Sequence, residues 1–269
     1  MVWFPNCKIN LGLHVIDKRP DGYHNIETVF YPIALRDALE IIQSAEMQFE
    51  VSGLEVTGNA EDNLCLKAYQ LLKKDFPRLP SLKIHLHKAI PTGAGLGGGS
   101  SDGAFMLKML NDKFDLQLSE KALIDYALQL GSDCPFFIIN KPSFATGRGE
   151  NLETVNLDLS GYKMIVVNPK IHVSTKDAFL KLTPTRPEKS IKEIVALPVV
   201  SWKNELINDF EKPVFDSHPA VKEIKDGMYA AGAIYASMTG TGSTVFGIFL
   251  KTFEPEFAFP KNYLLVVIP

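Results

Sequence analysis

A glycine-rich segment directly before an apolar stretch constrains the fold of this chain more than any other feature of its sequence. Residues 91–105 read PTGAGLGGGSSDGAF. Glycines let main-chain N–H groups approach a ligand closely, and the two serines that follow can cap a helix and donate hydrogen bonds. The apolar residues after them predict a buried helix over 100–111. The segment therefore predicts a loop that binds phosphate at the N-terminus of a helix.

The residues around this loop limit the alternatives. A Walker loop requires Lys and then Ser or Thr after its last glycine, whereas this chain has Ser100, Ser101 and Asp102 there. A flexible linker remains possible, but linkers are polar on both sides, and this segment stands between an alternating strand pattern and an apolar helix pattern.

A dinucleotide-binding loop is a further alternative. Gly93, Gly95 and Gly98 satisfy the spacing G-x-G-x-x-G, and Asp112 or Asp115 lies downstream at about the right distance for a ribose contact. That motif needs a strand running straight into its first glycine, and here a proline and a threonine intervene. An oxidoreductase of the Rossmann type thus stays open at this point.

Composition indicates a globular protein without an extended charged surface. The chain has 269 residues, of which 46% are hydrophobic and 22% charged, so it can bury the core of two domains or one large one. Its net charge of −3 and its lack of a long basic run argue against nucleic acid and anionic membranes as partners. An anionic substrate must therefore be held by local contacts.

Cysteine usage and the N-terminus predict the cellular setting. Cys7, Cys65 and Cys134 are odd in number and lack metal-binding spacing, which is typical of reduced thiols. Residues 1–15 have no basic start and are interrupted by polar residues, unlike a secretory signal. No apolar run reaches membrane-spanning length. We expect a cytoplasmic monomer or weak homodimer, with no membrane and no nucleic-acid partner.

Hydrophobic periodicity predicts strands first and helices later, which favours an α+β fold over regular βαβ alternation. In the first half we expect strands at 7–15, 26–34, 38–43, 47–57 and 82–89, and helices at 62–75, 100–111 and 119–130. Beyond them we expect repeated turns over 140–156, a strand at 162–167, a proline-rich connector at 183–198, helices at 202–210 and 219–231, and strands at 244–250 and 263–268. The fresh strand predicts two domains, residues 1–156 and 157–269.

Several polar groups could carry chemistry. Lys8 and Asn10 lie on one face of the first strand, where a solvated face is the simpler interpretation. Tyr23 and His24 follow a turn and could receive a flat ring. Asp133 follows a helix and would most simply be a cap or a turn former. A second glycine turn, in residues 238–246, could close over a second phosphate.

Five segments in this order resemble the motifs of the GHMP kinase superfamily: PNCKINLGLHV, RPDGYH, PTGAGLGGGSSDGA, GSDCPFF and MTGTGSTVF. The resemblance spans residues 5–246, and with NDFE at 208–211 it is most similar to the branch that acts on a cytidine diphosphate-linked methylerythritol. It implies a two-domain α+β fold, with a ribosomal-protein-like N-terminal domain, a ferredoxin-like C-terminal domain and the active site in the cleft between them. The implied reaction is ATP-dependent phosphorylation of the 2-hydroxyl of that small molecule.

The resemblance also implies a role for individual residues. ATP phosphates would lie against the glycine loop, which comprises Gly93, Ala94, Gly95, Leu96, Gly97, Gly98, Gly99, Ser100 and Ser101, with Asn63 near the nucleoside. Asp133 would accept the proton of the attacking hydroxyl, and Lys8 would orient that hydroxyl and stabilise negative charge. Asn10, Tyr23, His24 and Phe179 match residues that hold the substrate, the rings by stacking on cytosine and the imidazole by hydrogen bonding. Gly240 and Thr241 would face its diphosphate.

Some residues depart from the family pattern. Asp102, Gly103 and Cys7 stand where Asn, Ala and Ala are common, and Asp102 would bring an extra acid into the first turn of the helix, near the phosphates. The motifs contain no obvious acidic ligand for Mg²⁺, so ATP oxygens and water would hold it. Another GHMP kinase specificity, of the mevalonate, homoserine or sugar type, and a nucleotide-binding regulator without catalysis remain alternatives.

Overall fold

The computed structural model describes residues 1–56 and 58–269, which form two compact units. The first unit contains residues 1–7, 34–92 and 97–141, and the second contains residues 8–33, 93–96 and 142–269. Strands β2 (Asn6–Lys18) and β3 (His24–Arg36) contribute to both units, so this grouping follows no single boundary. The division after residue 156 stays a prediction. None of the helices in the described ranges combines the length and apolar character that crossing a membrane requires.

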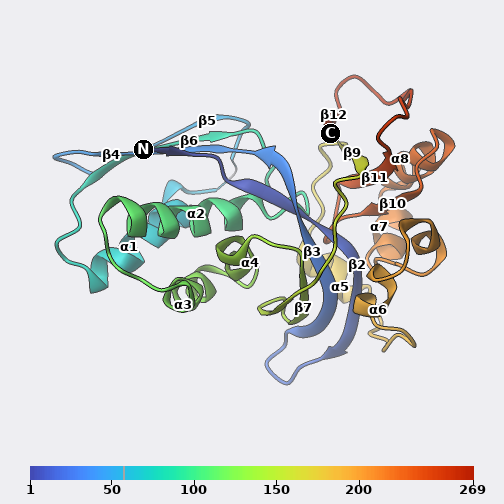
Figure 1. The fold of residues 1–269 in the computed structure, drawn as a ribbon, viewed down its shortest axis with the longest axis horizontal. Helices are drawn as coiled ribbons and strands as arrows, with labels where there is room; N and C mark the ends of the chain where they lie inside the picture. The colour runs from blue at the N-terminus through green and yellow to red at the C-terminus, as the bar shows by residue number, and fades with distance from the viewer. Residues whose placement is uncertain (57) are drawn as a thin grey trace. The chain divides into compact units, whose positions relative to one another are not determined.

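The first unit is a four-stranded sheet with helices on one side (Figure 1). The sheet order is β1-β4-β6-β5, in which β5 is parallel to β6 and the other neighbours are antiparallel. Its strands are β1 (Val2–Trp3), β4 (Ala38–Gln43), β5 (Gln48–Gly53) and β6 (Leu82–Lys88). Its helices are α1 (Leu64–Asp75), α2 (Gly98–Lys113), α3 (Glu120–Leu130) and α4 (Cys134–Ile139), and a short 3-10 helix, η1 (Ala60–Asp62), precedes α1.

Strand β6 shows why this sheet is covered on one side. Leu82, Ile84 and Leu86 alternate with more exposed residues and are fully buried. Lys88 continues the buried row, so an ammonium group ends an otherwise apolar face. Helix α2 covers this face and is buried along most of its length, and Gly103 permits its close approach to α1, because a Cβ there would lie 2.8 Å from Leu64 Cβ.

Two further sheets belong mainly to the second unit. One has the order β2-β3-β7-β8 and the other, which is antiparallel throughout, the order β10-β11-β9-β12. The additional strands are β7 (Ser143–Gly147), β8 (Asn151–Thr154), β9 (Tyr162–Asn168), β10 (Tyr235–Met238), β11 (Val245–Leu250) and β12 (Leu264–Ile268). The helical segments are α5 (Thr175–Leu180), α6 (Ile191–Val195), η2 (Val199–Asn204), α7 (Glu211–Ser217) and α8 (Pro219–Ala230).

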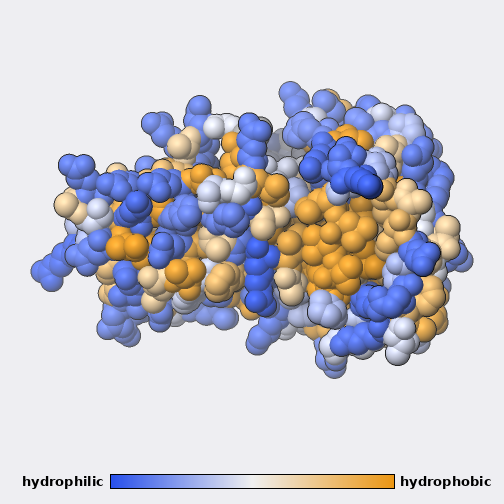
Figure 2. All heavy atoms as spheres, turned by 90° about the horizontal axis from the view of Figure 1, so that it is seen from above, coloured by the Kyte–Doolittle hydropathy of each residue, from blue (hydrophilic) through white to orange (hydrophobic). Residues whose placement is uncertain are grey.

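Helices α7 and α8 share one apolar cluster with the last sheet. Val214 of α7 and Val221 and Ile224 of α8 are buried together with residues of β9, β10 and β11. The edge strand β12 is less covered, because Leu265 and Val267 remain exposed. Figure 2 shows apolar residues gathered on one face of this unit.

Three expectations from the sequence were wrong. The helix expected at 202–210 is only the short 3-10 helix η2, because Asn208 leaves the helical path to form a β-bridge with Leu13 and to accept a hydrogen bond from the N–H of Phe210. The turns expected over 140–156 include the paired strands β7 and β8. The connector at 183–198 contains α6, which begins with a capping box of Ser190 and Glu193.

Trp202 tests the packing of the second unit. Its side chain is fully buried, its indole N–H donates to Leu197 O at 3.0 Å, and its ring packs edge-on against Tyr235. Trp202→Ala should therefore lower the free energy of unfolding by about 3–5 kcal/mol, measured by urea denaturation. The control is Val200→Ala, at a neighbouring exposed side chain, which should change it by less than about 0.5 kcal/mol. Equal effects of both variants would contradict this packing.

Candidate functional site

Alternating glycines and apolar residues shape the first part of the glycine loop. Gly93 and Gly95 have φ values of 63° and 79°, while the side chains of Ala94 and Leu96 are buried. A Cβ at Gly95 would lie 2.0 Å from Thr239 O, so this position requires glycine for space as well as for its dihedral angle. The loop is therefore anchored by two apolar side chains while its backbone turns at each glycine.

The second part of the loop opens α2 without a side-chain cap. Gly97, with φ 69°, is the N-cap and has no side chain to bind the N–H groups of the first turn. A Cβ at Gly98 would lie 2.8 Å from Ile90 Cγ2, whereas a Cβ at Gly99 would meet no atom within 4 Å. The helix start is thus tightly packed below Gly98 and open at Gly99, which is the arrangement that an approaching anion requires.

Asp133 lies at the start of α4, and α4 is linked to the start of α2. The Ser100 hydroxyl hydrogen-bonds the thiol of Cys134, whose pKa burial raises to about 12, so this thiol stays protonated. Asp133 is the N-cap residue of α4, but its side chain makes no capping bond to that helix. Asp133 therefore occupies the N-cap position and the turn before α4, as expected, but its side chain makes no capping bond to that helix.

Asn63 caps α1 and lines a pocket. Its side chain accepts a hydrogen bond from Cys65 N at 2.9 Å, which fixes its amide at the helix start. A pocket of about 480 Å³ opens beside it, with Phe49, Val51 and Leu54 among the apolar residues in its lining and Asn59 among the polar ones. Pockets of this size suit a small-molecule ring system.

Lys8 and Asn10 are buried, contrary to the expected solvated strand face. Lys8 is 4% exposed and Asn10 is 1% exposed, because both faces of β2 are covered along most of its length. The Lys8 Nζ donates to Asn10 Oδ1 at 2.6 Å and to Gly95 O at 3.4 Å, and it lies 4.8 Å from the centre of the Phe30 ring. The structure therefore places Lys8 in a buried polar network and not on a solvated face.

Two threonines that sequence analysis missed complete this network. Thr28 Oγ1 accepts from Asn10 Nδ2 at 3.0 Å and donates to Gly12 O. Thr239 Oγ1 accepts from Asn10 N at 3.0 Å and lies 3.0 Å from Gly95 O. Thr28 comes from β3, and Thr239 comes from the second glycine turn, just after β10, so only the fold shows that both contact Asn10.

The NDFE motif holds the second glycine turn. Asn208 Nδ2 donates to Met238 O at 2.8 Å and to Gly240 O at 2.9 Å, while Glu211 accepts from Met238 N at 2.9 Å. Gly240 has φ 56°, and a Cβ there would lie 3.0 Å from Gly95 Cα. Within the second unit the two glycine segments therefore touch backbone to backbone, and Thr241 lies beside them with its hydroxyl 3.2 Å from that of Thr175.

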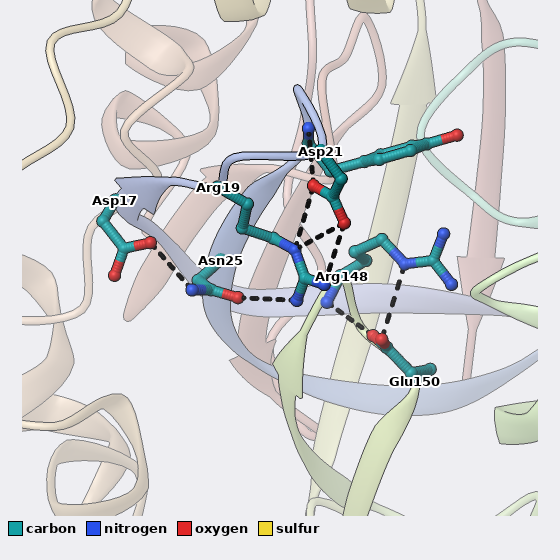
Figure 3. A network of polar contacts seen from close by, with 7 residues as sticks. Asp17, Arg19, Asp21, Asn25, Arg148 and Glu150 are labelled. Carbon is teal, nitrogen blue, oxygen red and sulfur yellow. Dashed lines mark hydrogen bonds and ion pairs between the residues drawn. The ribbon is translucent and has the colours of Figure 1, made fainter.

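A polar network stiffens the turn that carries Tyr23 (Figure 3). Arg19 binds the Asp21 carboxylate through Nε and Nη2, and Asp21 Oδ1 accepts from Tyr23 N at 3.1 Å. The Tyr23 ring is 56% exposed and lies 5.0 Å from the guanidinium of Arg148, which is itself bound to Glu150. One face of this ring is therefore supported by a cation, which favours a fixed ring orientation.

His24 and Phe179 lie together. Their rings are stacked with centroids 4.7 Å apart and an angle of 20°, and Phe179 also packs edge-on against Phe210. Burial, followed by the positive charge of Lys18, lowers the pKa of His24 below its usual 6.5. The imidazole is therefore neutral at pH 7, with one donor and one acceptor nitrogen.

The departures from the family pattern are accommodated inside the first unit. We expected Asp102 in the first turn of α2, but it lies one turn further into the helix and is buried. There its carboxylate accepts a hydrogen bond from Lys88 Nζ at 2.7 Å. Its carboxyl group is thus hydrogen-bonded to a buried lysine. Cys7 is fully buried, and Gly103 is required by the approach of α1.

The described residues contain no group of three or more His, Cys, Asp or Glu side chains arranged to hold a metal ion. Within the second unit the structure brings together Lys8, Asn10, Gly95 and Gly240, and separately His24 and Phe179. Within the first unit it links the start of α2, through Ser100, to Cys134 beside Asp133. The start of α2 and Asp133 therefore belong to one unit, and Lys8 with Asn10 and Gly240 belongs to the other.

Comparisons with known proteins match these motifs. The model of the GHMP kinase N-terminal domain matches residues 63–141, and the model of the C-terminal domain matches residues 189–259. The chain is 55% identical over 266 residues to the 4-diphosphocytidyl-2-C-methyl-D-erythritol kinase of Bacteroides thetaiotaomicron, an alignment that covers 97% of this chain and 95% of that protein.

Solved structures extend the similarity. A crystal structure of 4-(cytidine 5'-diphospho)-2C-methyl-D-erythritol kinase has a TM-score of 0.80 and 31% identity, covering 92% of this chain and 90% of that one. The mevalonate kinase of Methanococcus jannaschii has a TM-score of 0.71 over 99% of this chain and 97% of its own, but only 14% identity, and thus shares the fold alone.

A pair of glycine variants tests the shape of the loop. Gly95→Ala should lower the free energy of unfolding by at least about 1–3 kcal/mol, because its φ of 79° disfavours a side chain and the added Cβ overlaps Thr239 O. Gly99→Ala should leave it unchanged or raise it by up to about 1 kcal/mol, since the space is open and alanine favours a helix. Chemical denaturation measures both, and the reverse order would refute the loop geometry.

Proposed function

We propose a specific reaction for this chain, which belongs to the GHMP kinase family. It transfers the γ-phosphoryl group of ATP to the 2-hydroxyl of 4-diphosphocytidyl-2-C-methyl-D-erythritol, giving ADP and the 2-phosphate. The substrate assignment is supported by the relatives that carry this name, and the transfer is supported above all by the uncapped, open start of α2 with Asp133 nearby in the same unit. This reaction serves isoprenoid precursor synthesis by the methylerythritol phosphate route.

ATP would bind with its phosphates against the backbone from Gly93 to Ser101. The N–H groups of Gly98, Gly99 and Ser100 are the first-turn donors of α2, and the helix dipole adds a positive potential there. The nucleoside would enter the pocket beside Asn63. Mg²⁺ would supply neutralisation of phosphate charge when bound, and ATP oxygens and water would be its main ligands, because the described residues offer no acidic cluster for it.

Asp133 and Lys8 would have different roles at the attacking hydroxyl. The Asp133 carboxylate, which makes no capping bond to its helix, accepts the hydroxyl proton as the oxygen attacks the γ-phosphorus. The Lys8 ammonium, held by Asn10 Oδ1, orients the hydroxyl oxygen and stabilises the charge that builds up on the transferred group. Phosphoryl transfer depends mainly on such positioning and charge neutralisation, so this set suffices.

The substrate's cytosine would bind at the aromatic residues of the second unit. Tyr23 offers an exposed ring supported by Arg148, and Phe179 offers a second ring. Because His24 already stacks on Phe179, we infer that the base takes the place of the imidazole against this ring. The displaced imidazole would then hydrogen-bond the edge of the base, while Asn10, Gly240 and Thr241 contact the remainder of the substrate.

A regulator that binds nucleotide without catalysis is a weaker candidate, because a sensor would need neither Lys8 nor Asp133. The other GHMP kinase specificities share the fold at low identity, and the aromatic group around Tyr23 favours a nucleoside-bearing alcohol over mevalonate, homoserine or a sugar.

A coupled assay of ADP release tests the reaction and the two catalytic residues. The wild-type protein should consume ATP with the cytidylated alcohol and not with mevalonate, homoserine or galactose. Asp133→Asn and Lys8→Ala should each lower kcat at least about 100-fold, because each removes a group that acts in the transition state. Asp125→Asn, an exposed carboxylate on α3, should retain the wild-type rate. Near-normal rates in the first two variants would refute the assigned roles, and equal activity with another alcohol would refute the substrate.

The proposed role of His24 predicts a pH dependence. The folded-state pKa is lowered, so the neutral imidazole, which can accept from the amino group of cytosine, prevails at pH 7. We expect the KM for the cytidylated alcohol to be constant above about pH 6.5 and to rise as the pH falls below it, while the KM for ATP stays unchanged. Steady-state kinetics between pH 5 and 8 measures this, and His24→Gln should remove the rise. A KM that falls with acidification would contradict the role.

A further inference from the structure

A buried charge cluster lies beneath the start of α2 and has no role in the reaction described above. Lys88 Nζ, at the end of β6, donates to Asp102 Oδ2 on α2 at 2.7 Å and also to Asp37 Oδ2. All three side chains are almost completely buried, with exposed fractions of 3% or less. The cluster therefore combines one ammonium and two carboxyl groups in a dry environment within one unit.

We propose that binding of a nucleotide polyphosphate at the N-terminus of α2 is coupled to the uptake of a proton by Asp102. This inference rests on the proposed function, since it takes the ligand to be the ATP phosphates. The coupling makes nucleotide affinity depend on pH through a residue that does not touch the nucleotide.

The net charge of the cluster depends on how many protons its two carboxyl groups hold. With both carboxyl groups ionised, the cluster has a net charge of −1 and no access to water, which is costly. With one proton added, it becomes a neutral ion pair beside a neutral carboxylic acid. The cluster therefore favours holding one proton in addition to those of the lysine.

The hydrogen bonds decide which carboxyl group takes this proton. Asp37 Oδ1 accepts from the main-chain N–H groups of Ala89, at 2.6 Å, and Ile90, at 2.8 Å, which stabilise its ionised form. Asp102 Oδ1 is buried and has no hydrogen-bond partner among the described residues. The proton therefore belongs on Asp102, where it can be donated to the neighbouring Asp37 carboxylate.

The surroundings of Asp102 also favour its protonated form. Burial is the largest cause that raises the pKa of Asp102, to about 8, and the negative charge of Asp37 adds to it while Lys88 opposes it. Cys65 of α1 also faces the cluster, and burial raises the pKa of its thiol well above the usual value, so the thiol stays neutral. Near pH 8 Asp102 is thus the group of this cluster that changes charge.

The position of Lys88 links the cluster to the phosphate loop. A Cβ at Gly98, the first residue of α2, would lie 3.4 Å from Lys88 Nζ, so the ammonium lies directly below the first turn. A polyphosphate on that turn is attracted by Lys88 and repelled by an ionised Asp102 in a region of low dielectric. The bound anion must therefore raise the pKa of Asp102 further, and by linkage the protonated protein must bind the anion more tightly.

Isothermal titration calorimetry with Mg²⁺ and β,γ-imido-ATP tests this coupling in the full chain. At pH 8, titrations in two buffers with different ionisation enthalpies should show uptake of up to about half a proton per nucleotide, because about half of Asp102 is already protonated in the unliganded protein. The dissociation constant should be constant below pH 7 and rise above pH 8, by at most about tenfold per pH unit.

Variants separate this proposal from the proposed function. Asp102→Asn, which is neutral at every pH, should bind the nucleotide without proton uptake and with a flat pH dependence from pH 7 to 9. Asp112→Asn, an exposed acid near the end of the same helix, should keep the wild-type uptake. Binding by the wild type without uptake, or uptake that persists in Asp102→Asn, would overturn the coupling. No nucleotide binding at any pH would instead refute the proposed function.

A measurement on the wild type covers the case in which Asp102→Asn does not fold. Carboxyl carbon resonances of aspartate, followed by NMR from pH 5 to 10, should contain one group that titrates near pH 8 and moves to higher pH with the nucleotide. If all aspartates titrate below pH 6 in both states, Asp102 is ionised and the coupling does not exist.

Discussion

The structural feature on which the proposed chemistry depends is the uncapped first turn of α2. Gly97 has no side chain to bind the N–H groups of this turn, and the space at Gly99 is open. Close packing holds this turn in place. Gly98 packs against Ile90 and Lys88, and α2 is buried along most of its length. A rigid, buried helix with an open start is a preorganised anion site.

The surrounding residues in each unit support this chemistry in different ways. In the second unit, Lys8 is buried and its Nζ donates to Asn10 Oδ1, while Thr239 Oγ1 accepts from the N–H of Asn10. The NDFE motif contributes by holding the backbone of the second glycine turn through Asn208 and Glu211, so its constraint is structural. In the first unit, Asp133 is the N-cap residue of α4 and makes no side-chain capping bond to it, and we propose its carboxylate as the acceptor of the hydroxyl proton.

The sequence predicted well those features that depend on local patterns. The strand over 7–15, the alternation over 82–89 and the helix expected at 119–130 each reflect neighbouring residues, and the structure contains them, although both faces of the first strand are buried. Prediction from the sequence failed where contacts between distant residues determine the structure. Asn208 leaves the helical path that we expected, and Thr28 and Thr239 contact Asn10 only in the folded protein. The sequence could have predicted that Lys88 is buried, because it continues the buried alternation of Leu82, Ile84 and Leu86. It could not have predicted that its partners are Asp37 and Asp102.

The most direct test of the central claim is amide NMR of the ¹⁵N-labelled protein during titration with Mg²⁺ and β,γ-imido-ATP. Donation of hydrogen bonds to phosphate should move the amide proton resonances of Gly98, Gly99 and Ser100 downfield more than those of any other helix start. If the nucleotide binds and these three resonances stay in place, the phosphates lie elsewhere and the account given for this loop is wrong.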